Sequence, residues 1–137
     1  MAGEANRRLV EAFYERLWNR GELDAADELL AADFAFRGSL GYQAHGPDGF
    51  RTYVGMVRAA FPDFHNALEE TIAEGERIAA RLTWTGTHRG PFLGIAPTGR
   101  RISYQGVGLF TVAGGRLASA WVVGDGYALL RQLGALG

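Results

Sequence analysis

Apolar residues recur at helical spacing through the first half of the chain. Between Glu4 and Asn19 they are Leu9, Val10, Phe13 and Leu17. Gly21 follows where a helix end favours a left-handed residue, and a shorter helix is predicted from an Asp24 cap through Leu30. A third helix opens at Gly46-Pro47-Asp48 and is stopped by Pro62. The pattern therefore predicts three N-terminal helices.

Beyond this point apolar and polar positions alternate with a period of two, which is typical of strands. The alternation predicts four long strands, Phe64–Ala73, Ile78–His88, Ile102–Val112 and Leu117–Val123, after a short one at Asp33–Arg37. The one long connection, Arg89–Arg100, is rich in Gly and Pro. The prediction is a single α+β domain over residues 1–137, with the three helices packed in the concave face of a strongly curved, mainly antiparallel sheet.

Alternate residues of a strand point to the same side of the sheet, so their positions in the sequence predict which of them face the helices. The residues assigned to that face are Ile78, Ala80, Leu82 and Trp84, then Tyr104, Gly106, Gly108 and Phe110, and in the last strand Leu117, Ser119, Trp121, Val123 and Asp125. Such a face is apolar and aromatic, with one carboxylate at the end of a strand. Enclosed by the helices, it predicts a small-molecule pocket.

Composition removes several classes of function. The 137 residues carry a formal net charge of −1, which gives no reason to expect nucleic acid as a partner. Cysteine is absent, which excludes disulfides and thiolate chemistry, and no apolar run approaches the ~20 residues of a membrane span. We therefore expect a cytoplasmic protein without a membrane anchor.

Cofactor and metal motifs are also missing from the sequence. No Gly-x-Gly-x-x-Gly follows a predicted strand, and no Walker loop or Gly-x-Ser-x-Gly elbow is present. His45, His65 and His88 lie on different predicted elements without metal-ligand spacing. The prediction is no cofactor and no metal, with His88 holding the long loop in a structural role.

Seven short motifs, taken together, resemble one known family. They are Phe13-Tyr14, Trp18-Asn19-Arg20-Gly21, His45-Gly46-Pro47-Asp48-Gly49-Phe50, Thr85-Gly86-Thr87-His88-Arg89-Gly90, Gly94-Ile95-Ala96-Pro97-Thr98-Gly99-Arg100, Trp121 through Asp125, and Leu130-Arg131-Gln132-Leu133-Gly134. As a set they are similar to the SnoaL-like polyketide cyclases and ester cyclases of the nuclear-transport-factor-2-like superfamily. The resemblance implies a cone-shaped α+β barrel.

The resemblance also implies a catalytic residue. In the family's aldol cyclases an aspartate seven residues before the Gln of the Gln-Leu-Gly ending acts as general acid/base, and counting back from Gln132 gives Asp125. Two histidines accompany that aspartate in those enzymes, and their positions match Gly108 and Val123 here. A competing interpretation makes Asp125 the N-cap of a helix beginning at Gly126.

Further site residues follow from the predicted pocket. Tyr53 and Tyr104 are candidate catalytic residues, because a phenol can donate a hydrogen bond to a carbonyl or enolate oxygen. The predicted substrate-binding residues are Trp18, Phe34, Phe36, Met56, Trp84, Gly106, Gly108 and Trp121. The two glycines are expected to enlarge the pocket where the aldol cyclases carry larger side chains.

The functional hypothesis is a cofactor-independent cyclase that closes a ring in a polyketide-like hydrophobic molecule, with Asp125 as general acid/base. The alternatives are a shape-driven cyclase without a general base, by pericyclic or hydroxyl-addition closure, and a non-catalytic binding module. An epoxide hydrolase ranks below both, since no second carboxylate can be placed on the predicted face. Val107 and Leu109 on the outer face of the sheet favour a homodimer.

Overall fold

The computed structural model describes residues 2–136, and within them it contains four α-helices, one π-helical segment and six strands. The helices are α1 (Ala2–Ala12), the π-helical segment η1 (Phe13–Asn19), α2 (Ala25–Leu29), α3 (Gly46–Ala60) and α4 (Gly126–Gln132). The strands are β1 (Leu30–Arg37), β2 (Gln43–His45), β3 (His65–Glu74), β4 (Arg77–Thr87), β5 (Arg101–Ala113) and β6 (Arg116–Gly124). The predicted α+β class is confirmed.

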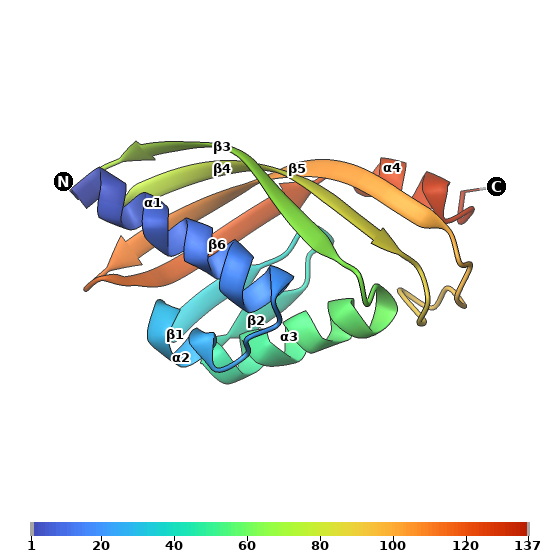
Figure 1. Cartoon of the computed structure of the whole chain (residues 1–137), viewed down its shortest axis with the longest axis horizontal. Coiled ribbons are helices and arrows are strands. Elements are labelled where there is room, and N and C mark those ends of the chain that lie inside the picture. The colour runs from blue at the N-terminus through green and yellow to red at the C-terminus, as the bar shows by residue number, and fades with distance from the viewer. Residues whose placement is uncertain (1, 137) are drawn as a thin grey trace.

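All six strands form one sheet in the order β2-β1-β6-β5-β4-β3. Neighbours are antiparallel except β1 and β6, which run parallel. Figure 1 shows the long strands arching over α1 and α3. Because β2 and β3 are open edges, the sheet curls without closing into a full barrel. The four-stranded meander is confirmed, whereas β2 was missed.

The first predicted helix is two segments rather than one. After α1 the chain widens into η1, whose last turn is closed by a bond from the Arg20 amide to the Glu15 carbonyl, 3.0 Å long. This segment buries Tyr14 and Trp18 on its inner side. Gly21 has the expected positive φ of 67°, but the Asp24 side chain makes no capping hydrogen bond to α2.

The parity assignment holds for two strands and fails for the third. Tyr104 and Phe110 on β5 and Trp84 on β4 face the core as predicted. In β6 Ala118 is an extra residue, since Thr111 pairs with Ser119 while Val112 pairs with Leu117. This bulge reverses the facing of the rest of the strand. Trp121 is 48% exposed on the outer side of the sheet, which corrects its predicted place in the pocket.

Aromatic rings fill the space between the sheet and the helices. Phe50 on α3 is fully buried, and its ring centroid lies 5.1 Å from that of Phe13 and 4.8 Å from that of Phe36. Phe34 is fully buried in the same cluster, against Phe13 and Phe50. It is a core residue that does not line the pocket described below, which corrects its predicted place there.

The outer face of the sheet carries an apolar patch. Val107 pairs with Val123 and Leu109 pairs with Trp121 across β5 and β6, and all four side chains are exposed. The Arg37 guanidinium lies 4.8 Å from the centre of the Trp121 ring. The patch agrees with the surface from which a homodimer was predicted, and the dimer stays a prediction.

Glycines in β5 and β6 allow the Trp84 ring to lie against the sheet. A Cβ at Gly106 would overlap the Trp84 ring and would lie 2.5 Å from the Val123 carbonyl oxygen. A Cβ at Gly124 would lie 2.8 Å from the same ring. The space above Gly106 is therefore filled by an indole, and the prediction of a larger pocket at this glycine is wrong.

We expect Gly106→Ala to lower the free energy of unfolding by about 1–3 kcal/mol, because the Cβ would overlap both a ring and a backbone oxygen. Gly55→Ala is the matched control: a Cβ at this exposed position of α3 meets nothing within 4 Å, and alanine should stabilise by about 0.5–1 kcal/mol. Urea unfolding measures both. Equal effects of the two substitutions would contradict the packing of Trp84 on Gly106.

Candidate active site

An aromatic pocket opens between the concave face of the sheet and the helices. Its lining comes from η1, β1, α3, β3, β4, β5 and β6 and from the loops between them. Its cavity volume is about 40 Å³, within an empty space of about 540 Å³ that includes open solvent. The lining side chains most important for the argument are Tyr14, Trp18, Phe36, Tyr53, Asn66, Trp84 and Tyr104. An aromatic hollow thus lies where the sequence places a pocket, and its role as the substrate pocket stays a prediction.

The predicted site residues divide into two groups. Trp18, Phe36, Tyr53, Trp84 and Tyr104 line the pocket, as expected, and their contact with substrate stays a prediction.

Four other predicted site residues lie elsewhere. Met56 is on the exposed side of α3, 51% accessible, and Trp121 is on the outer face of the sheet. Gly108 lies under the Phe110 ring and the Tyr14 hydroxyl, so it adds no space, and the same holds for Gly106 under Trp84.

Asp125 occupies a different environment from the predicted one. Its carboxylate is exposed and accepts a 3.0 Å hydrogen bond from the Ala128 amide, which caps α4. Trp121 and Val123, predicted to surround it, point outward because of the β6 bulge. The capping interpretation is thus confirmed and the apolar environment is wrong. Catalysis by Asp125 stays a prediction.

Three phenols converge on the pocket. Burial raises the pKa of Tyr14, Tyr53 and Tyr104, and the value for Tyr53 is about 12. Electrostatic interaction with Tyr53 adds a smaller contribution to the raised pKa of Tyr14 and of Tyr104. At neutral pH all three hydroxyls are protonated and can donate hydrogen bonds to a carbonyl oxygen of a bound molecule.

Among the pocket residues absent from the set predicted from the sequence are Tyr14 and Asn66, which both carry hydrogen-bonding groups. Tyr14 lies four residues before Trp18, and this spacing on a helix could have placed both on one face. Asn66 is almost fully buried at an inward position of β3. A buried amide next to apolar residues requires hydrogen-bond partners, and that requirement was the available signal.

A chain of hydrogen bonds through Asn66 holds Trp84 in place. The Trp84 indole Nε1 donates to Asn66 Oδ1 at 2.8 Å. The amide Nδ2 and backbone N of Asn66 donate to Asn19 Oδ1 at 3.1 and 2.8 Å. Asn19 Nδ2 in turn donates to the Asn66 carbonyl at 3.0 Å. The end of η1 thereby orients the ring that forms the pocket floor.

Hydrogen bonds from His88 join the two ends of the long loop, which agrees with the structural role predicted for this residue. Its backbone N donates to the Arg100 carbonyl at 2.9 Å, and its carbonyl accepts from the Gly99 amide at 2.8 Å. The fully buried ring also accepts from the Thr98 amide at Nδ1, at 3.2 Å. These bonds fix the loop that carries Phe92 to the pocket.

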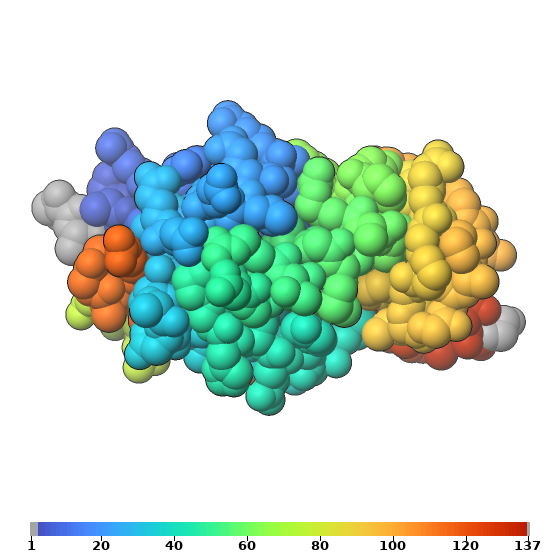
Figure 2. Space-filling view, turned by 90° about the horizontal axis from the view of Figure 1, so that it is seen from below, coloured from blue at the N-terminus to red at the C-terminus, as the bar shows by residue number. Residues whose placement is uncertain are grey.

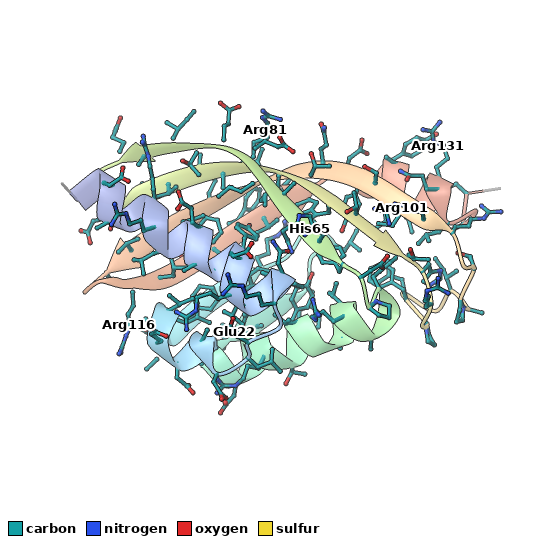
Figure 3. All side chains as sticks on the ribbon, viewed as in Figure 1. Glu22, His65, Arg81, Arg101, Arg116 and Arg131 are labelled. Carbon is teal, nitrogen blue, oxygen red and sulfur yellow. The ribbon has the colours of Figure 1, made fainter. Side chains whose placement is uncertain are left out.

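Charged groups lie outside the pocket. Within the described residues its lining contains no carboxylate, imidazole or guanidinium group. Arg81, Arg116 and Arg131 point away from the body of the molecule (Figure 3). In the same range of residues no three His, Asp or Glu side chains are grouped to bind a metal ion, and no helix is long and apolar enough to cross a membrane.

Comparison with known proteins identifies the family. The model of the SnoaL-like polyketide cyclase family matches residues 8–133. Nogalonic acid methyl ester cyclase of Streptomyces nogalater is 34% identical over 128 residues, which cover 92% of each chain. Aklanonic acid methyl ester cyclase of Streptomyces peucetius is 29% identical, over 93% of this chain and 87% of that protein.

Solved structures agree with this assignment. TsrD from Streptomyces laurentii superposes with a TM-score of 0.86 at 29% identity, over 98% of both chains. A SnoaL-like polyketide cyclase from Agrobacterium tumefaciens shares the fold, with a TM-score of 0.80 at 22% identity, over 93% of this chain and 97% of that one. The chain belongs to the SnoaL-like polyketide cyclase family. It is an enzyme of the ring-closing type found in polyketide biosynthesis.

We expect Asn66→Ala to lower the free energy of unfolding by about 1–3 kcal/mol, because it leaves the buried Trp84 N–H without a partner. In a Trp84→Phe background the same substitution should cost about 1 kcal/mol less, since no donor is left unpaired. Asn6→Ala, which removes a distant bond to the Gly75 carbonyl, is the control and should be additive with Trp84→Phe. If the effects of Asn66→Ala and Trp84→Phe are instead additive, the hydrogen bond between these two side chains does not contribute to stability as stated.

The raised phenol pKa predicts a loss of stability in alkali. An unfolded tyrosine titrates near pH 10 and Tyr53 near 12, so the stability that its phenol contributes is complete below about pH 10 and is lost as pH rises towards 12. Lysine and cysteine are absent, so tyrosines are the main side chains that titrate there. Over the same rise in pH, the free energy of unfolding of Tyr53→Phe should fall by about 1–2 kcal/mol less than that of the wild type. This range allows for the partial exposure of Tyr53.

Urea unfolding at pH 8, 10 and 11.5 measures the effect of Tyr53→Phe. The control is Tyr127→Phe, whose ring is 69% exposed and should follow the wild type at every pH. A Tyr53→Phe curve parallel to that of the wild type would show that burial does not hold this phenol protonated.

Proposed function

We propose that the protein closes a ring in a polyketide-derived methyl ester, without a cofactor, and that Tyr53 and Tyr104 polarise the carbonyl group under attack. The observation that carries the proposal is the cluster of buried, protonated phenols in an aromatic pocket. The named relatives are cyclases of nogalonic and aklanonic acid methyl esters, and this supports a substrate of the same class.

In the proposed ring closure, negative charge develops on the oxygen of the attacked ketone. An enol carbon of the substrate attacks a ketone carbon of the same molecule, forming a carbon–carbon bond, while the enol oxygen becomes a carbonyl and releases its proton. The attacked ketone oxygen becomes an alkoxide and takes up a proton, so the product is an isomer of the substrate. Phenols aimed at that oxygen stabilise the developing charge, and each such donor contributes about 10²–10³-fold in rate.

The phenol pair also offers a route for the proton. A hydroxyl that donates to the alkoxide can accept the proton released by the enol, directly or through its neighbour, so no permanent base is required. Tyr53 and Tyr104 line the same hollow, which supports this route. The apolar lining contributes by folding the flexible substrate so that its reacting carbons meet.

A second candidate mechanism uses Asp125 as the general acid/base. It is favoured by one observation: Gly124, the preceding residue, packs against Trp84 and Ser39, which line the pocket. Asp125 is therefore one residue from the pocket wall. In this mechanism the carboxylate, rather than a phenol, takes the proton from the substrate carbon.

Kinetics of four variants on aklanonic acid methyl ester distinguish the mechanisms. We expect Tyr53→Phe and Tyr104→Phe each to lower kcat by about 10²–10³-fold with a smaller change in KM, because the lost bond strengthens in the transition state. Asp125→Asn should keep kcat within about threefold, and it preserves the helix cap because Asn is an equally good cap. Tyr127→Phe is the exposed control and should match the wild type.

Other outcomes reject the phenol mechanism. A loss of more than about 100-fold in Asp125→Asn, with full activity in both pocket variants, would assign the chemistry to the carboxylate. Binding of the ester by the wild type without any conversion would favour a binding module instead.

A further inference from the structure

A second hollow adjoins the mouth of the pocket on the side of α3. It is lined by Leu40, Tyr42, Met56, Ala59, Pro91 and Leu93, and we refer to it as the outer groove. Its empty volume is about 1140 Å³, open solvent included. Figure 2 looks onto this side, where the yellow segment after β4 borders the green C-terminal end of α3.

The outer groove adjoins the pocket. Leu40, Tyr53, Val57 and Phe92 line both hollows, so only these side chains lie between them. Tyr53 is central to this arrangement. Its ring is stacked on that of Tyr42, with centroids 4.7 Å apart and planes at 24°, while the same residue lines the inner pocket.

The groove gathers exposed apolar side chains. Met56 is 51% and Leu93 57% accessible, and Leu40 and Tyr42 are also exposed. Large apolar side chains that surround one hollow on a protein surface mark a binding site more often than an isolated exposed one does. No charged side chain is among the described residues that line the groove, which selects an uncharged ligand.

The loop that carries Leu93 is rigidly built. Phe92 and Ile95 exchange two backbone hydrogen bonds, of 3.0 and 2.8 Å, around the two-residue turn Leu93-Gly94. Leu93 adopts a positive φ of 51°, which is uncommon for a residue other than Gly, Asn or Asp. Such a conformation persists where the surrounding structure enforces it, and it is found repeatedly at ligand-binding sites. Here it holds an apolar side chain on the rim of the groove.

We propose that the outer groove is a second subsite, which binds a flat, uncharged aromatic portion of the substrate against Tyr42 and between Met56 and Leu93. The reacting end of the same molecule then lies in the inner pocket, and this last point rests on the proposed function. The stacked Tyr42 and Tyr53 rings supply a face for a planar ring system, and Met56 and Leu93 cover its edges.

Binding of 1,8-dihydroxyanthraquinone, a planar uncharged probe, tests the subsite by isothermal titration calorimetry. We expect Met56→Gln and Leu93→Asn each to raise Kd by at least fivefold, and Asn tolerates the left-handed backbone at position 93. Ile72→Gln is the matched control: Ile72 is 65% exposed and lines neither hollow, so its substitution should leave Kd unchanged.

The proposed function and the proposed subsite can be rejected independently of each other. Anthraquinone binding needs no turnover, so it tests the groove even where no ester is converted. With a substrate that is converted, the groove variants should raise KM at nearly constant kcat, the reverse of the effect expected for Tyr104→Phe.

Three results would overturn the subsite. The first is a Kd that both groove variants leave unchanged. The second is a Kd that Tyr104→Phe raises and the groove variants do not, which would place the probe in the inner pocket. The third is a wild type that binds no probe and self-associates in sedimentation, with Leu93→Asn dissociating it, because the groove would then be covered by a second copy of the chain.

Discussion

The indole of Trp84 is the contact on which the geometry of the pocket depends. It packs closely against β5 and β6 because residues 106 and 124 lack a Cβ, and Asn66 accepts one hydrogen bond from its N–H. The Tyr104 ring packs against it with centroids 5.0 Å apart. A shift of the indole would therefore move the nearest phenol as well. The glycines serve close packing here, and they add no volume to the pocket.

The sequence predicts the fold well where periodicity is strict. The inward positions of β4 and β5 follow from uninterrupted alternation, and the ends of α3 follow from Pro47 and Pro62, because each strand or helix repeats one local rule. The bulge at Ala118 is different, since the extra residue depends on register with β5 and β1 and leaves no local signal. That single residue moved Trp121 and Val123 from the predicted pocket to the outer face.

The same bulge explains why the candidate site was only partly predictable. Aromatic residues on α3, β4 and β5 reach the pocket because these elements are regular, and Tyr53, Trp84 and Tyr104 were predicted for that reason. Trp18 also reaches it, although η1 is wider than the helix that was predicted. Asp125 depends on β6, and its carboxylate also faces a competing local partner in the Ala128 amide. Asn66 was not predicted because its partners, Asn19 and Trp84, are distant in sequence and meet only in the folded chain.

Tyr53 stands at the boundary between two environments, and this position has a physical consequence. Its hydroxyl is shielded enough for the pKa to rise to about 12, which keeps it a donor, while its ring forms a stacked pair with the exposed Tyr42. A hydrogen bond donated into an apolar pocket is stronger than the same bond in water. A ligand that covered the outer pair would exclude more water from the inner phenols. Occupancy of the exposed hollow would thus strengthen the hydrogen bonds that polarise a carbonyl group within the pocket.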